Sequence, residues 1–294
     1  MVRILITGAN GFIGSELVHF FSKKYGYEII QVSRNSNLSS GLSFHTPDVY
    51  SEYEWNHICS GIDIIIHTMG CSSIKSLNNC ESMHDINVKQ TENLAAAAKL
   101  NNVKKFIFLS SVSVYGQDIP FEINEKSPFN PLTEYARNKL DAETSLKIIL
   151  KNTSVSLTII RPPLVYGLGA NGTCKTIFSL IKKKLPLPIK NIKNKRSYVH
   201  IDNLINFVEL TTVHPKAKNQ AFLISDDNDL STPELFSHLA KLINKKVYLI
   251  YFPTIILKIL LMLSGREILK NQLFGNMPIC IEKSKNLLGW KPVK

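Results

Sequence analysis

A tyrosine and a lysine four residues apart are the first side chains whose types and spacing could do chemistry. Tyr135 and Lys139 would share one face of a helix that we expect over residues 133–151. A free tyrosine titrates at about 10, and a neighbouring ammonium favours the phenolate and lowers that value. Ser111 follows an apolar, strand-like run, so its hydroxyl could hold a substrate oxygen beside the tyrosine. Together the three side chains indicate proton transfer at a hydroxyl or carbonyl group.

A glycine-rich turn follows the first apolar run of the chain and opens a predicted helix. Glycines there permit a tight turn and let backbone N–H groups approach a pyrophosphate, and the helix N-terminus favours that anion. The sequence therefore predicts a dinucleotide-binding loop made by Gly8, Gly11, Phe12, Ile13 and Gly14.

The end of the second predicted strand bears on the choice of nicotinamide cofactor. A carboxylate at this place typically binds the ribose 2′-hydroxyl of NAD. Here the strand has no acidic residue at its end and closes with Ser33 and Arg34. These two side chains could hold the 2′-phosphate of NADP through a hydrogen bond and a charge-assisted pair. We therefore expect NADP or NAD, and the two residues favour NADP.

Strand-length apolar runs alternate with helical patterns along the first half of the chain. This alternation predicts an α/β fold, a Rossmann-type doubly wound parallel sheet with a smaller C-terminal substrate lobe. After residue 162 the alternation loosens and proline and lysine become dense. We expect an NAD(P)-binding domain over 1–162, to which 197–213 return with a helix at 201–213, and a substrate-binding lobe over 163–294. The predicted strands are 2–7, 28–32, 62–67, 105–110 and 155–161, and the predicted helices are 12–24, 83–100 and 133–151.

These motifs together resemble the extended short-chain dehydrogenase/reductase family of NAD-dependent epimerases and dehydratases. The glycine loop matches its Gly-x-x-Gly-x-x-Gly, the tyrosine and lysine match its Tyr-x-x-x-Lys, and Ser111 matches its serine position. The resemblance implies that Ser111, Tyr135 and Lys139 are catalytic, with Ser111 and Tyr135 also touching the substrate. It further implies that His67, Asn87 and Lys139 contact the cofactor, and that Arg196 meets a substrate diphosphate.

Longer stretches narrow the resemblance to bacterial enzymes that are similar to UDP-glucose 4-epimerase. The stretches are residues 161–167, 185–188 and 229–235. The resemblance implies hydride transfer at C4 of a UDP-sugar. Arg34 favours a UDP-4-keto-6-deoxy-N-acetylhexosamine 4-reductase of surface polysaccharide biosynthesis over the alternative, a UDP-glucose or UDP-N-acetylglucosamine 4-epimerase with tightly bound NAD. A non-catalytic NAD(P)-binding protein is a further alternative. The subgroup often has an asparagine where this chain has Thr173, which is then the expected substrate contact.

Composition bears on partners and location. The formal net charge is +12, but no nucleic-acid-binding motif appears, so we expect no nucleic-acid partner. The lysine-rich stretch 182–196 instead favours an anionic substrate through long-range attraction. Histidine and cysteine spacings fit no metal site, and the five unpaired cysteines indicate a reduced, cytoplasmic protein. The apolar run 254–263 is interpreted as a buried amphipathic helix without stable membrane insertion. A homodimer is an open alternative to a monomer.

Overall fold

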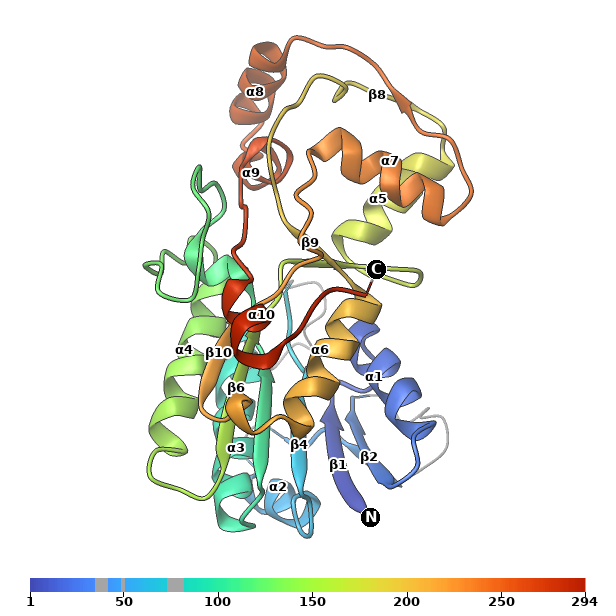
Figure 1. Cartoon of the computed structure of the whole chain (residues 1–294). Helices are drawn as coiled ribbons and strands as arrows, with labels where there is room; N and C mark the ends of the chain where they lie inside the picture. The colour runs from blue at the N-terminus through green and yellow to red at the C-terminus, as the bar shows by residue number, and fades with distance from the viewer. Residues whose placement is uncertain (35–41, 49–50, 73–81, 294) are drawn as a thin grey trace.

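A parallel β-sheet forms the centre of the computed structural model, which describes residues 1–34, 42–48, 51–72 and 82–293 (Figure 1). Within these residues the strand order is β10-β6-β5-β4-β1-β2-β3, and all neighbours run parallel. The sheet is covered on both faces, as its continuous apolar strands require. Its strands are β1 (Val2–Thr7), β2 (Tyr27–Ser33), β3 (Leu42–His45), β4 (Ile64–His67), β5 (Lys105–Leu109), β6 (Ser156–Arg161) and β10 (Gln220–Leu223).

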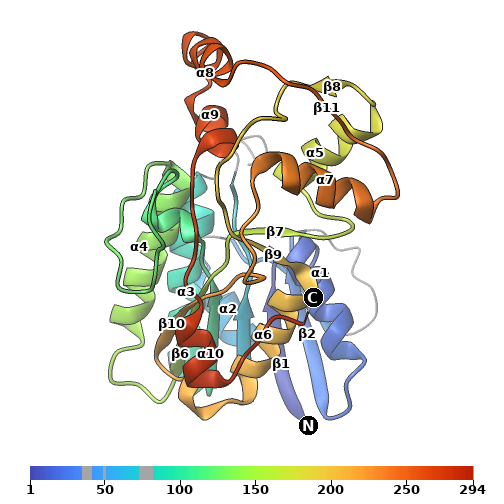
Figure 2. The same ribbon diagram turned by 45° about the horizontal axis from the view of Figure 1, so that its top comes forward.

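Two sets of helices cover the two faces of the sheet (Figures 1 and 2). One face packs against α1 (Phe12–Ser22), α6 (Ile201–Val213) and α10 (Glu282–Leu288). The other packs against α2 (Glu52–Ile58), α3 (Gln90–Leu100) and α4 (Glu134–Ile149). A π-helical turn, η2 (Asp85–Lys89), precedes α3, and a 3₁₀ turn, η3 (Val112–Tyr115), follows β5; a second 3₁₀ turn, η4 (Pro215–Ala217), follows α6.

A smaller group of elements lies beyond one end of the sheet and has its own apolar core. Two short parallel pairs help to build it, β7 with β9 and β8 with β11. The helix α8 lies at the far end of this group in both views (Figures 1 and 2). The elements are β7 (Leu164–Tyr166), α5 (Thr173–Lys182), β8 (Pro186–Leu187), β9 (Tyr198–His200), α7 (Thr232–Leu242), β11 (Tyr248–Leu249), α8 (Thr254–Leu263) and α9 (Glu267–Phe274).

The structure confirms the doubly wound α/β fold expected from the sequence, and it corrects two details. The strand β10 joins the sheet beside β6, although it follows the predicted boundary at residue 163. The helix over 254–263 forms, but the prediction that it is buried is wrong, because only Leu261 of α8 is buried. The helix lies outside the layers that cover the sheet, where few elements can shield it.

The loop between β1 and α1 depends on close contact between two of its glycines. Gly8 has φ +71°, a left-handed conformation that favours glycine. A Cβ placed on Gly14 would lie 2.1 Å from the carbonyl oxygen of Gly8. The absence of a side chain at residue 14 is therefore what lets α1 begin so close to the loop.

We predict that Gly14→Ala destabilises the apo protein by about 1–3 kcal/mol, the usual cost of overpacking. The gain of about 1 kcal/mol in helix propensity is smaller than the cost of moving backbone away from the new methyl group. Gly11→Ala is the matched control, because its Cβ would lie 3.1 Å from the same oxygen. Urea unfolding curves measure both variants, and equal midpoints for Gly14→Ala and wild type would contradict the prediction.

Candidate active site

Most of the expected site residues come from one edge of the sheet, where the parallel strands end. In the registers, Thr7 of β1 pairs with His67 of β4, and His67 pairs with Phe108 of β5. The glycine loop follows β1 and Ser111 follows β5. Ligands of open α/β sheets bind outside the carboxyl ends of the strands, so this edge is the candidate active site.

Ser111 is held with its hydroxyl proton free to point at Tyr135. Ser111 precedes η3, and its Oγ accepts hydrogen bonds from the backbone N–H and the hydroxyl of Ser113, at 3.1 and 2.9 Å. With those bonds accepted, Ser111 can donate its own proton, and its side chain hydrogen-bonds with that of Tyr135. Sequence reasoning missed Ser113, although its place two residues after Ser111 was the available signal.

Lys139 is buried one helical turn after Tyr135. Its Nζ donates to the carbonyl oxygen of Leu109 at 2.9 Å and lies 4.7 Å from the centre of the Phe108 ring. Burial lowers the pKa of Lys139 to about 8, against the opposing charge of Glu143. A Cβ on Gly70 would lie 3.2 Å from Nζ, so a glycine is what leaves room there for the ammonium. The sequence analysis did not identify Gly70.

The phenol of Tyr135 does not have the lowered pKa that the sequence suggested. Burial raises its pKa to about 12, and the hydrogen bond from Ser111 opposes this only in part. The ammonium of Lys139 is directed at the Leu109 carbonyl. Its raised pKa makes Tyr135 a protonated phenol at neutral pH.

A buried ion pair fixes α4, the helix that carries both residues. Glu143 accepts from Arg161 of β6 at 2.8 Å (Nε to Oε1) and 2.5 Å (Nη2 to Oε2), and Arg161 Nη1 donates to the Tyr115 hydroxyl at 2.5 Å. The Arg161 and Glu143 side chains are 2% and 0% exposed. Because Glu143 lies one turn after Lys139, the bidentate pair sets the position of Lys139 relative to the strand ends.

Two residues that were expected to contact the cofactor support the site from behind. His67 has no exposed surface, and its Nδ1 and Nε2 lie 2.6 Å from Thr7 Oγ1 and 2.9 Å from Thr91 Oγ1. The Thr91 hydroxyl donates to the Asn87 carbonyl, so it accepts from Nε2–H of a neutral imidazole. The Asn87 amide pairs with both backbone groups of Cys71, at 2.7 and 2.8 Å. The expectation that His67 and Asn87 contact the cofactor stays a prediction.

The glycine loop has the features that a pyrophosphate requires. Gly11 is the N-cap of α1, so no side chain caps the N-terminus of the helix, and the first turn contains no acidic residue. Phe12 and Ile13 begin the helix. Exposed N–H groups and the positive end of the helix dipole therefore face the strand edge. These residues fit a dinucleotide.

The two residues that favour NADP differ in exposure. Ser33 is 4% exposed, whereas Arg34 is exposed and lines a cavity of about 350 Å³ with His45 and Gln90. Of the two, Arg34 is the side chain that a 2′-phosphate could reach.

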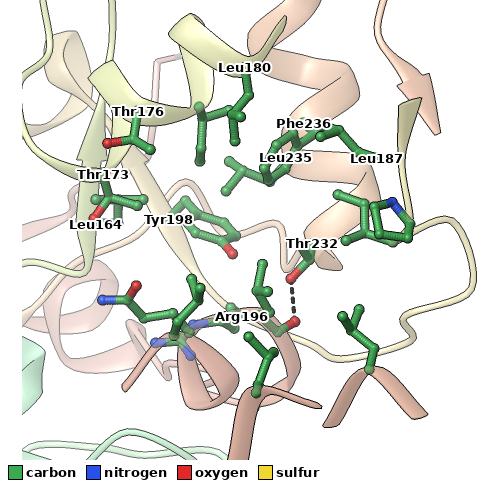
Figure 3. A pocket seen from close by; sticks show the side chains of 18 residues that line it. Leu164, Thr173, Thr176, Leu180, Leu187, Arg196, Tyr198, Thr232, Leu235 and Phe236 are labelled. Atoms are coloured by element: carbon green, nitrogen blue, oxygen red, sulfur yellow. Dashed lines mark hydrogen bonds between the residues drawn. The ribbon is translucent and has the colours of Figure 1, made fainter. Parts of the chain in front are cut away.

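Arg196 joins the reaction edge to a larger, mostly apolar cavity. It lines a space of about 150 Å³ together with Ser111, and also a neighbouring cavity of about 510 Å³ that Thr173 borders (Figure 3). Its Nη1 donates to the carbonyl oxygens of Gln117, Asn271 and Gly275 at 3.2, 3.0 and 3.4 Å. Burial lowers the pKa of Arg196, but an arginine still stays charged at neutral pH.

The larger cavity is lined mainly by helices of the outer group. In Figure 3 the aliphatic side chains converge on it, and Thr232 donates to the Leu273 carbonyl at 2.6 Å, which links α7 to α9. Its apolar lining comes from α5, α7, α8 and α9, and includes Ile177, Leu180, Leu235, Phe236, Leu257, Leu261, Leu269 and Leu273.

Among the described residues no group of three His, Cys, Asp or Glu side chains could hold a metal ion. No helix of the described part of the chain is long and apolar enough to span a membrane.

We predict that His67 makes the fold sensitive to mild acid. Burial lowers its pKa to about 3, with a smaller contribution from the charge of Lys139, against 6.5 when unfolded. Between those values the unfolded chain binds the extra proton, so stability falls as pH falls below 6.5. The His67 contribution should cost about 2 kcal/mol between pH 7 and 5. Urea unfolding of His67→Gln should show a flatter pH dependence, and an unchanged one would contradict the assignment.

Comparison with known proteins agrees with this geometry. A family model described as "NAD dependent epimerase/dehydratase family" matches residues 4–225. The chain is similar to a protein of Vibrio cholerae named UDP-glucose 4-epimerase, with 32% identity over 298 residues, 98% of this chain and 90% of that protein. It is also similar to the N-acetyl-alpha-D-glucosaminyl-diphospho-ditrans,octacis-undecaprenol 4-epimerase of Escherichia coli O157:H7, with 25% identity over 85% of this chain and 75% of that one.

Solved structures show the same fold. The UDP-glucuronic acid 4-epimerase from Bacillus cereus in complex with NAD has a TM-score of 0.80 at 21% identity, over 100% of this chain and 94% of that one. MoeE5 in complex with UDP-glucuronic acid and NAD has a TM-score of 0.78 at 22% identity, over 99% and 94%. The matched family model, which spans most of the chain, and the relative from Vibrio cholerae show that this chain belongs to the NAD dependent epimerase/dehydratase family.

Proposed function

We propose that the chain catalyses hydride transfer at C4 of a sugar joined to a diphosphate, with 4-epimerisation of a UDP-sugar as the overall reaction. One observation carries the proposal. Ser111, hydrogen-bonded with Tyr135, shares a cavity with Arg196. A sugar at Ser111 would therefore have its diphosphate toward a guanidinium, whose fork geometry suits phosphate oxygens.

In this proposal the chain's own residues orient the sugar and move a proton. Ser111, fixed as a donor by Ser113, hydrogen-bonds O4 and stabilises its developing charge. In the oxidative half Tyr135 takes the O4 proton as a phenolate, and in the reductive half it returns that proton to O4. Its raised pKa favours the donor form, so the oxidative half requires positive charge beside the phenol to favour the phenolate. Lys139 and the glycine loop hold the nicotinamide cofactor, which when bound accepts or supplies the hydride.

The epimerase and the reductase use the same residues and differ in cofactor turnover. An epimerase returns the hydride to the other face of C4 and keeps its NAD, and the names of the Vibrio and Escherichia relatives support this version. A 4-reductase consumes reduced cofactor, and the exposed Arg34 beside a cavity supports that second candidate, because NADPH carries the phosphate that an arginine binds.

The group beyond the diphosphate also has two candidates. The relatives suggest uridine in one case and an undecaprenyl chain in the other. Thr173, Thr176 and Tyr198 border the larger cavity and offer hydroxyls to a nucleoside. Most of its remaining lining is aliphatic, which suits an isoprenoid equally well. UDP is the proposed group, and the lipid carrier is the alternative that the substrate panel must include.

A substrate panel tests the reaction. Purified protein should carry stoichiometric NAD and convert UDP-N-acetylglucosamine or UDP-glucose to the C4 epimer with nothing added. The panel includes N-acetylglucosaminyl-diphospho-undecaprenol and a UDP-4-keto-6-deoxy-N-acetylhexosamine. If the keto-sugar is the only substrate converted and its conversion consumes NADPH, the reductase replaces the epimerase as the proposed function. NADPH should then bind about 10- to 100-fold tighter than NADH, and Arg34→Ala should remove that gap.

We predict that Tyr135→Phe lowers turnover by about 10² or more, the scale of general acid–base catalysis, while the fold and cofactor binding persist. The substitution removes one hydroxyl and keeps the ring. Tyr25→Phe is the matched control, because Tyr25 is fully exposed and should keep wild-type turnover. Turnover of the Tyr135→Phe variant within a few-fold of wild type would remove Tyr135 from the mechanism.

A further inference from the structure

The helix α8 presents an apolar surface to solvent that the reaction does not explain. Successive residues of a helix are about 100° apart, so its six large exposed side chains fall within an arc of about 160°. These side chains, here called the α8 face, are Ile255 (71% exposed), Ile256 (48%), Ile259 (49%), Leu260 (53%), Met262 (53%) and Leu263 (82%). Contiguous exposed apolar surface of this kind marks an interaction site.

The opposite side of α8 is also apolar, and it faces inward. Leu257 and Leu261 line the larger cavity, as does Leu269 of α9. The helix therefore separates the cavity from the α8 face by about its own diameter, on the order of 10 Å. Ile268 of α9 (56% exposed) and Tyr251 (71%), which precedes α8, continue the exposed apolar side chains along the sequence.

The charge of the chain is concentrated in the part that carries this face. Residues 1–162 contain 15 basic and 15 acidic residues, whereas residues 163–294 contain 20 basic and 8 acidic ones. The segments 182–196 and 241–275 together have 13 basic residues and one acid, Glu267. Backbone hydrogen bonds join the two segments, from Lys190 N–H to Ile250 O and from Ile250 N–H to Leu187 O. The α8 face thus belongs to a strongly basic region.

This combination identifies the kind of partner. A second copy packed through the same face would bring two basic regions together, and like charges at an interface oppose association. An anionic bilayer offers negative headgroups to the lysines and an apolar boundary to the isoleucines. We propose that the α8 face docks on the surface of an anionic phospholipid bilayer, lying in its interface without spanning it.

The docked orientation follows from the positions of the charges. Lys258 is on α8 itself, with its Nζ 5.0 Å from the centre of the Phe274 ring, whereas Arg266 is the N-cap of α9 and Lys270 lies in the first turn of that helix. Long basic side chains beside an inserted apolar face reach the headgroups while their stems stay apolar. Docking brings the larger cavity close to the bilayer and leaves the cofactor edge of the sheet outside it. The docking proposal goes beyond the proposed reaction and does not depend on it.

Sedimentation with vesicles, without substrate, tests the docking. Wild-type protein should bind vesicles of phosphatidylcholine with about 30% phosphatidylglycerol, and bind pure phosphatidylcholine far more weakly, with binding reduced at about 0.5 M salt. The triple variant Ile255→Ser/Ile259→Ser/Leu263→Ser should bind at least about tenfold more weakly, because it removes apolar area from the contact. Lys258→Gln with Arg266→Gln should weaken binding about 5- to 25-fold.

The matched control is Leu100→Ser/Ile148→Ser/Val213→Ser, which removes three exposed apolar side chains (70%, 68% and 62%) from the sheet domain. It should bind vesicles within about twofold of wild type. Failure of wild type to bind anionic vesicles, or equal binding by the α8 variant and the control, would overturn the docking. So would a wild-type dimer that the α8 variant dissociates, because the face would then be covered by a second copy. The substrate panel is a separate assay, so either proposal can fail alone.

Discussion

The buried pair of Arg161 and Glu143 determines where the reactive side chains lie. Tyr135 and Lys139 are both on α4, and Glu143 of the same helix is the residue bound to the sheet in fork geometry. Replacing such a pair by apolar residues is often neutral for stability, but a bidentate contact fixes a helix in rotation and height as an apolar contact does not. Separating Arg161 from Glu143 would leave unpaired buried charges. A shift of α4 that separates them is therefore costly in free energy.

The same edge of the sheet brings together residues that are far apart in sequence. Parallel strands place all their carboxyl ends on one side, so the glycine loop, Ser111 and α4 meet without any long connection reaching across the fold. Behind them, the neutral His67 ring is hydrogen-bonded with the hydroxyls of Thr7 and Thr91. The Asn87 side-chain amide is hydrogen-bonded with the Cys71 backbone. Such fully bonded polar groups are costly to disturb, which makes the edge rigid.

The sequence predicted the fold, because strand periodicity and glycine spacing are local signals, and the fold places most of the candidate residues at one edge of the sheet. The strand 2–7 and the helices 201–213 and 254–263 have their predicted bounds. What it could not predict depends on contacts between distant segments. Gly70 matters because Lys139 comes from elsewhere to lie against it, and His67 turns to threonines on either side. The burial of α8 was mispredicted for the same reason, since an apolar run does not reveal whether anything covers it.

The exposure of α8 therefore depends on the tertiary arrangement, and composition alone does not reveal it. A net charge of +12 suggests lysines spread over all surfaces, yet residues 1–162 have equal numbers of basic and acidic residues and residues 163–294 hold the entire excess. The part proposed to bind the cofactor need not attract anions from afar, because the N-terminus of α1 does so locally. The part proposed to meet the sugar diphosphate adds long-range attraction to the cavity that Arg196 lines. The same field acts on any anionic surface that the α8 face approaches, so one charge distribution serves both the proposed substrate and the proposed bilayer contact.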